Sequence, residues 1–165
     1  MNSSEHRADA AKLPHPDATG TLRGLVGASE LVAVETVHFH ARRAEHTVGK
    51  ALPPIDVASV RVEPTFDTLK PVHPPPGSAT FLVRGNIKFQ PNGDNSDAVA
   101  EIQIVLRLTY NFAGQTAALP DDSLQQFANQ IALHHAWPFL RERVATACQI
   151  LGVQGYVLPL RKLVG

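Results

Sequence analysis

The sequence predicts an α+β domain with a four-stranded antiparallel sheet followed by two C-terminal helices packed on one side. Two long segments, Ala79–Gln90 and Ala98–Phe112, place apolar residues at every second position, which is typical of strands with one buried and one wetter face. Further on, apolar residues recur at three- and four-residue steps around Trp137, which indicates an amphipathic helix. Strands grouped before helices favour a sheet with the helices segregated to one side.

Composition limits the domain count and the classes of partner. A chain of 165 residues fits one domain of ordinary size. Fifteen basic and fifteen acidic residues cancel, so the basic footprint of a nucleic-acid-binding protein is missing, while a net charge of zero is compatible with self-association. The single cysteine excludes an intramolecular disulfide and fits a reducing compartment. No apolar run approaches the length of a membrane span, so we expect a cytoplasmic protein without membrane insertion.

The N-terminal segment is predicted to be an arm rather than part of the domain. Residues 1–20 are polar and contain two prolines, so we expect them to be disordered, with a single domain over residues 21–165. A short helical turn is expected between residues 21 and 30. The first strand is predicted over Leu31–Arg43, where Val37 and Phe39 would share a face with two alanines, Ala33 and Ala41.

The second strand is predicted over Ser59–Asp67, after a loop long enough to be a crossover. Pro64 removes one ladder donor, which favours an edge position for this strand. A proline-rich run leads to the third strand, and the turn residues 91–95 predict that the third and fourth strands form a hairpin. Gly85 interrupts the third strand as a bulge or as a point of close approach.

Two helices are predicted after the strands. Proline and carboxylates over residues 120–123 mark a helix start, and Phe127 and Ile131 give this helix an apolar side. The second helix surrounds Trp137 and should end where Gly152 takes the left-handed conformation. Pro138 fits either its first turn or a kink in a run that begins earlier. Tyr156–Leu160 is expected to be a short extended tail.

The segment Trp137-Pro138-Phe139-Leu140-Arg141-Glu142 resembles the SecB-like export chaperone family, whose members tend to carry an aromatic-Pro-aromatic-x-Arg-Glu helix after a four-stranded antiparallel sheet. Val37-His38-Phe39 is similar to the family's first strand, and the resemblance covers most of residues 31–160. It implies a holdase that binds unfolded polypeptides, forms a homotetramer or homodimer, and uses no nucleotide, metal or other cofactor. It also implies a role in preprotein export and translocation or in toxin–antitoxin control.

The resemblance also suggests partners and roles for individual residues. Beside unfolded clients and further copies of itself, the chain would meet either the export motor ATPase or an antitoxin. Family positions that carry acidic residues for the motor fall here near Thr36 and His40. A peptide-binding groove is expected to be lined by six apolar residues: Val37, Phe39, Phe66, Phe81, Val83 and Phe89. A structural role, fixing helix against sheet or subunit, is expected for five residues: Trp137, Pro138, Phe139, Arg141 and Glu142.

Residues with possible chemistry have simpler explanations. His38 and His40 have the spacing of two metal ligands on one strand face, but no third ligand is near in sequence. His134 and His135 could form a pH-sensitive hinge, or they could simply be polar residues at a helix end. Cys148 fits a small buried thiol. We therefore expect no metal, no catalytic site and no enzyme activity.

A second function remains open from the residues alone. A sheet curved at Gly85 and capped by the Trp137 helix could enclose a pocket for a small hydrophobic ligand. A monomer with such a ligand would favour this alternative over the holdase.

Overall fold

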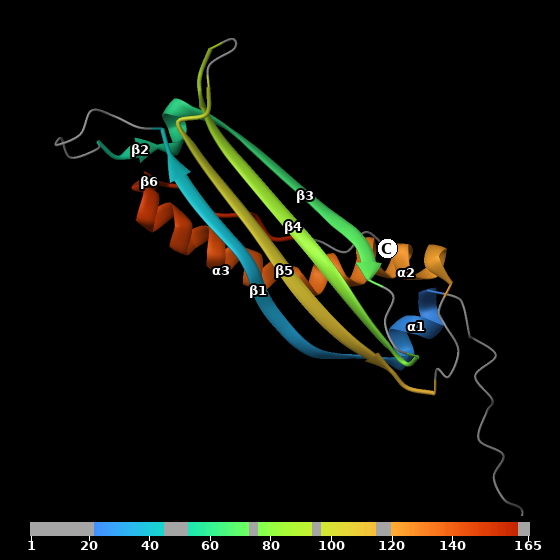
Figure 1. Ribbon diagram of the computed structural model, residues 1–165. Helices are drawn as coiled ribbons and strands as arrows, with labels where there is room; N and C mark the ends of the chain where they lie inside the picture. The colour runs from blue at the N-terminus through green and yellow to red at the C-terminus, as the bar shows by residue number, and fades with distance from the viewer. Residues whose placement is uncertain (1–21, 45–52, 73–75, 94–96, 115–119, 162–165) are drawn as a thin grey trace, which may run out of the picture.

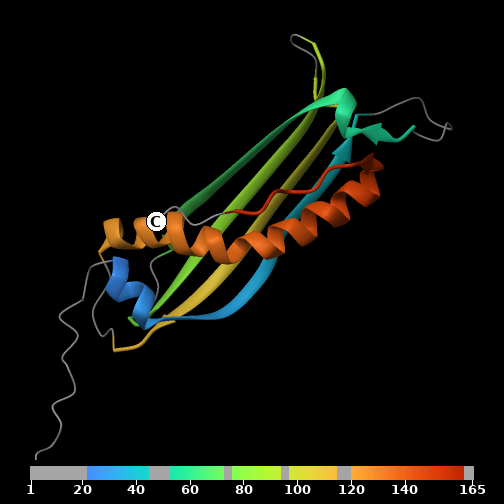
Figure 2. The same ribbon diagram turned by 180° about the vertical axis from the view of Figure 1, so that it is seen from behind.

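The computed structural model describes residues 22–44, 53–72, 76–93, 97–114 and 120–161, so the predicted arm of residues 1–20 lies outside the described residues. The molecule has two layers, a four-stranded antiparallel sheet and a helical layer that runs along one of its faces (Figure 1 and Figure 2). The predicted α+β class, with the helices on one side of the sheet, is confirmed.

The main sheet has the strand order β1-β5-β4-β3, and all neighbouring strands are antiparallel. Its members are β1 (Ser29–Arg43), β3 (Val60–Val72), β4 (Ser78–Pro91) and β5 (Ala100–Phe112). β4 and β5 form the predicted hairpin at the centre, while β1 and β3 are the two edges. The crossover after β1 carries β2 (Ile55–Asp56), which pairs in parallel with β6 (Val153–Gln154) beyond the last helix.

The helical layer is one long run. α2 (Asp121–Phe127), the π-helical turn η2 (Ala128–Ala132) and α3 (Leu133–Leu151) follow one another while the backbone stays in the right-handed helical region at both junctions. The two predicted helices are therefore joined end to end. Pro138 lies in the second turn of α3, inside this longer run, so a place in the first turn is wrong. Two short elements complete the described helices, α1 (Leu22–Ala28) and the 3-10 turn η1 (Val57–Ser59).

Two bulges interrupt the pairing of β1 with β5. The register shifts between Leu31 and Ala33 and again between Thr36 and His38, so Val32 and Val37 are the extra residues. Each bulge resets the alternation of faces along the strand. Phe39 and Ala41 stand opposite inward residues of β5, whereas Ala33 stands opposite Thr109 on the outer face. The prediction that all four apolar residues of this strand share one face is therefore wrong.

The core lies between the inner face of the sheet and the helical run. At one end of this core, the ring of Phe127 in α2 packs among three other aromatic rings. Its centroid lies 5.4 Å from that of Phe81, 5.0 Å from that of Tyr110 and 5.4 Å from that of Phe112. Small side chains let the helical run approach the strands closely, and the fully buried ones are Ala128, Ala132, Ala136 and Ala147.

Gly85 is a point of close approach and not a bulge, because it pairs with Phe66 in an unbroken stretch of the β3–β4 register. A Cβ atom at Gly85 would lie 3.0 Å from Cε1 of Phe66 and 3.5 Å from Cδ2 of Leu140. The Phe66 ring thus occupies the space that any larger residue at position 85 would need.

Replacing Gly85 with valine is expected to lower the free energy of unfolding by about 1–3 kcal/mol, since overpacking forces neighbours out of their preferred rotamers. Urea denaturation followed by circular dichroism measures the change. Gly27→Val is the matched control, because a Cβ atom there would have no heavy atom within 4 Å. Equal losses in the two variants would contradict the packing argument.

Candidate functional site

Three of the six residues predicted to line a groove are core residues. Phe81, Val83 and Phe89 point from β4 toward the helical layer and are fully buried. The groove prediction is wrong for them as the chain is folded. The helical run is longer than the sequence pattern suggested, and it covers the inner faces of both central strands.

The other three predicted groove residues lie at opposite edges of the sheet. Val37 and Phe39 are on β1, where 41% and 38% of their surface is exposed. Phe66 is on β3, half-buried, with its ring centroid 4.7 Å from that of Trp137 in an edge-on contact. Because β5 and β4 separate β1 from β3, these side chains cannot form one continuous groove within a single chain.

Exposed apolar side chains gather where β1 runs beside α3. Nε of Arg143 donates to Oγ1 of Thr36 at 3.2 Å, which brings this side of α3 next to the β1 bulge. Phe139 and Ile150 lie four residues before and seven after Arg143, so they share its helix face, and both are exposed. We call this the β1–α3 surface, formed by Val37, Phe39, Phe139 and Ile150.

The sequence analysis did not single out Ile150 for a functional surface. The seven- and eleven-residue spacing of Phe139, Thr146 and Ile150 was readable in the sequence, on the side of the helix away from Leu140 and Val144. Val37 lies at a bulge, which the pattern did not reveal.

Of the predicted structural motif, Trp137 lies between α3, the sheet and the C-terminal segment. Its ring is buried against Phe66, and its Nε1 donates to the carbonyl of Pro159 at 2.7 Å. It therefore connects α3 both to the edge strand β3 and to the C-terminal segment. Phe139 is exposed instead, so it does not pack the helix against the sheet within one chain.

The remaining motif residues, Pro138, Arg141 and Glu142, lie toward the surface of α3, and Arg141 is half-buried. Within the described residues, neither Arg141 nor Glu142 forms an ion pair. A contact of these side chains with another subunit stays a prediction.

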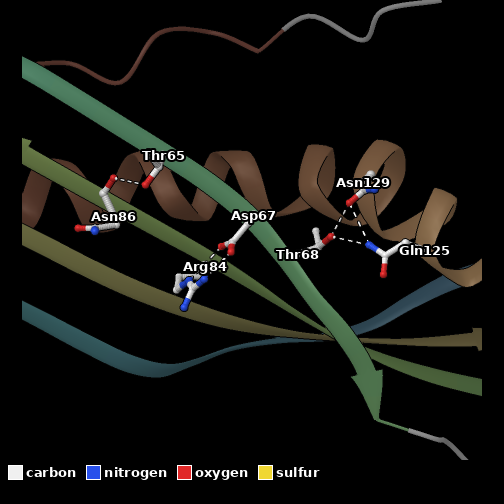
Figure 3. A network of polar contacts seen from close by, with 7 residues as sticks. All are labelled: Thr65, Asp67, Thr68, Arg84, Asn86, Gln125 and Asn129. Atoms are coloured by element: carbon white, nitrogen blue, oxygen red, sulfur yellow. Dashed lines mark hydrogen bonds and ion pairs between the residues drawn. The ribbon is translucent and has the colours of Figure 1, made fainter.

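The outer face of the sheet is polar and its charges are largely paired. Arg84 binds Asp67 across β4 and β3, and Oγ1 of Thr65 donates to the carbonyl of Asn86 at 3.3 Å (Figure 3). Near the β1 edge, Arg107 pairs with Glu35 at 3.2 Å. Such a face offers little apolar area, so the apolar contacts of a ligand have to come from the edges and the helical side.

One buried carboxylate marks the end of this face. Glu101 accepts from Gln103 at 3.1 Å and pairs with Arg42 at 2.8 Å. The hydrogen bond from Gln103, and then the contact with Arg42, lower the pKa of Glu101 despite its burial. The carboxylate stays charged, with both hydrogen-bond partners in place. It lines a hollow of about 670 Å³ that carries charges of both signs, from Arg42, Arg43 and Lys88 and from Asp97 and Glu101.

Polar side chains also connect β3 to the helical layer. Nε2 of Gln125 donates at 3.2 Å to Oγ1 of Thr68 and at 3.2 Å to Oδ1 of Asn129, and Thr68 and Asn129 are themselves hydrogen-bonded (Figure 3). This cluster fixes α2 and η2 over the end of β3. The space between sheet and helices here is filled by the aromatic cluster around Phe127. At Gly85, where the alternative function placed a ligand pocket under the Trp137 helix, Phe66 and Leu140 occupy the space.

The two histidine pairs have different surroundings. His38 and His40 lie on the outer face of β1 with ring centroids 6.4 Å apart, and among the described residues no group of three potential ligands surrounds a metal position. Nδ1 of His135 lies 2.9 Å from the hydroxyl of Tyr110 in the core. Burial, and then the neighbouring His134, lower the pKa of His135, while burial raises the pKa of Tyr110.

The burial of His135 predicts a loss of stability in mild acid. The folded state favours neutral His135, whereas an unfolded histidine takes up a proton near its ordinary pKa of 6.5. The contribution is therefore fully present above that pKa and is lost as the pH falls through it toward the lower folded pKa. Urea unfolding at several pH values is expected to show this slope, and His135→Gln should flatten it while His40→Gln on the surface should not.

Cys148 is buried, as predicted, and burial raises the pKa of its thiol to about 11. The thiolate is therefore scarce at neutral pH, which makes this side chain a poor nucleophile. None of the helices in the described part of the chain has the length and apolar character needed to cross a membrane.

No protein-family model matches the sequence, and no curated protein matches it either. Among solved structures, the chain is similar to the SecB-like chaperone Rv1957 of Mycobacterium tuberculosis in complex with a ChAD peptide from the HigA1 antitoxin. The TM-score is 0.69, and the match covers 85% of this chain and 95% of that chain. This chain has a SecB-like fold. The sequences share 11% identity, so the likeness establishes the fold alone.

In this chain the strands of the main sheet precede the long helical run, and β1 pairs with β5, the last strand of that sheet. The chain keeps this arrangement with few residues in common with its structural neighbour. Conservation of the buried pattern, and not of particular side chains, is enough to maintain such a core.

Proposed function

We propose that this chain is a SecB-like holdase, which binds unfolded polypeptides without catalytic chemistry or a cofactor. The observation that carries the proposal is the β1–α3 surface on the edge of a SecB-like sheet. Val37 and Phe39 expose apolar area on a strand whose outer edge meets no other described strand. Exposed apolar surface of this kind is typical of interaction sites.

The edge strand suits an extended polypeptide. β1 contains neither proline nor lysine, residues that commonly protect exposed edges, and after its second bulge the six residues His38–Arg43 run in unbroken register with β5. An unfolded segment can pair its backbone with such an edge and bury alternate apolar side chains against it. A folded protein has already satisfied its backbone groups, so the site would distinguish unfolded from folded forms.

Further copies of the chain and clients are the partners we propose for this surface. A homodimer or homotetramer would cover part of the exposed apolar area, in keeping with the net charge of zero. The neighbouring structure holds an antitoxin peptide, which supports an antitoxin as the client of this chain over an exported preprotein. Thr36, near a position of the motor contact in the family, already receives a hydrogen bond from Arg143.

Light scattering of the protein, alone and with reduced, carboxymethylated pancreatic trypsin inhibitor, tests the proposal. This inhibitor is permanently unfolded, and its native disulfide-bonded form is the matched control. We expect an oligomer that forms a complex with the unfolded form and not with the native form. A monomer indifferent to both forms would contradict the holdase, and a hydrophobic ligand should then be sought in the purified protein.

A further inference from the structure

The last described segment of the chain lies in an extended conformation along its own helical layer. We call Tyr156–Arg161 the C-terminal strap. It follows β6 and runs back along α3 on the side of β3, in the direction opposite to the helix (Figure 2). It belongs to neither a helix nor a strand, so side-chain contacts must hold it in place.

The strap inserts alternate side chains, as a bound peptide would. The Tyr156 ring stands edge-on to Phe89 with the centroids 5.4 Å apart, and Leu158 is only 2% exposed. Between and beyond them the side chains of Val157 and Leu160 point outward, the latter 78% exposed. The strap therefore covers Phe89, one of the residues predicted for a peptide groove.

Trp137 holds the end of the strap. Its Nε1 donates to the Pro159 carbonyl at 2.7 Å, and Cζ of Arg161 lies 5.6 Å from the centroid of its ring. The same indole contacts Phe66 of β3. Of the predicted groove residues, Phe89 therefore contacts the strap directly, and Phe66 is connected to it through Trp137.

Among the described residues, the strap nevertheless leaves one of its buried polar groups without a hydrogen-bond partner. The Tyr156 hydroxyl is buried and has no hydrogen-bond partner among the described residues. Within that same part of the chain, the indole bond to Pro159 is the hydrogen bond that holds residues 156–161. An unpartnered buried hydroxyl disfavours the bound state, so a better-matched segment can replace this one.

We propose that the C-terminal strap occupies a second client-binding site, from which an extended client segment displaces it. The inference rests on the proposed holdase function. The strap itself indicates the preferred ligand: an extended segment with apolar side chains two residues apart and a basic residue three positions later, over Trp137. Phenylalanine at the first position should bind better than tyrosine, because the site provides no partner for a hydroxyl group.

Two variants with opposite expected effects test the displacement. Leu158→Ser removes the buried anchor of the strap and is expected to tighten binding of the unfolded inhibitor by roughly three- to tenfold. Tyr156→Phe removes only the unpartnered hydroxyl, so the strap should hold more firmly and binding should weaken by about two- to fivefold. Leu160→Ser, on the exposed side of the same strap, is the matched control and should leave binding unchanged.

Trp137 gives a direct signal, since it is the single tryptophan of the chain and the inhibitor contains none. Leu158→Ser without client should shift its emission to longer wavelength, because the strap no longer covers the indole, and client binding to this variant should shift the emission back. If circular dichroism shows that Leu158→Ser does not fold, the affinity of Tyr156→Phe for the unfolded inhibitor still decides.

The outcomes separate the two proposals. If the wild type binds the unfolded inhibitor but the affinities of the strap variants and the Trp137 emission do not change, the strap is structural and this inference is overturned, while the holdase stands. If no form of the protein distinguishes unfolded from native inhibitor, the holdase itself fails.

Discussion

Glutamate in place of Phe39 is expected to weaken binding of the unfolded inhibitor by at least about tenfold. Burying a phenylalanine side chain contributes roughly 1.5–3 kcal/mol, and about 1.4 kcal/mol corresponds to a factor of ten in affinity. A carboxylate at this position must also lose water when an apolar segment covers it, which adds to the cost. Fluorescence anisotropy of labelled inhibitor measures the dissociation constant.

Ala145→Glu is the control for this prediction, since it adds the same charge at an exposed position of α3 without removing a large apolar side chain. Its dissociation constant should stay within about twofold of the wild type. Unchanged affinity in Phe39→Glu would remove β1 from the client site. If its oligomer mass changed at the same time, Phe39 would belong to the contact between subunits.

Alanine in place of Phe127 is expected to lower the free energy of unfolding by about 3–5 kcal/mol, a large part of the stability of a domain of this size. Phe127 is fully buried, and its ring contacts Phe81, Tyr110 and Phe112 with centroids between 5.0 and 5.4 Å away. Truncation removes the apolar area and leaves a cavity between β4, β5 and the helical run. Urea unfolding measures the loss.

Phe139→Ala is the matched control, because it is the same substitution in the same helical run at a position that is half-exposed. We expect it to cost less than about 1 kcal/mol, as exposed substitutions usually do. Similar losses at the two positions would mean that Phe139 is buried in the oligomer. That result would in turn support a subunit contact through the β1–α3 surface.

The sequence predicted the architecture well because its strongest signals are local. The alternation through β4 and β5 defines an inner face without reference to the rest of the chain, and Gly152 ends α3 as its position suggested. The conformation of β1 was less accessible, because nothing in the residues around Val37 specifies that a bulge interrupts their pairing with β5.

The candidate site was harder to predict for a related reason. Period-two patterning shows which side chains share a face of the sheet, but not which other element covers that face. Phe81 and Phe89 were therefore placed in a groove, although Phe127 and Tyr156 cover them in the folded chain. The extended tail was predicted, whereas its position against Trp137 depends on tertiary contacts between distant residues.

The pairing of β1 with β5 has a consequence for biosynthesis. Glu35 and Arg107, which pair across these strands, are 72 residues apart. During translation, β1 leaves the ribosome long before its partner strand exists. A nascent copy therefore displays Val37 and Phe39 on an unpaired, extended segment, which is the kind of chain that the finished protein is proposed to hold. Completed molecules would then bind newly made chains before these fold, so that production of the chaperone favours its own correct folding.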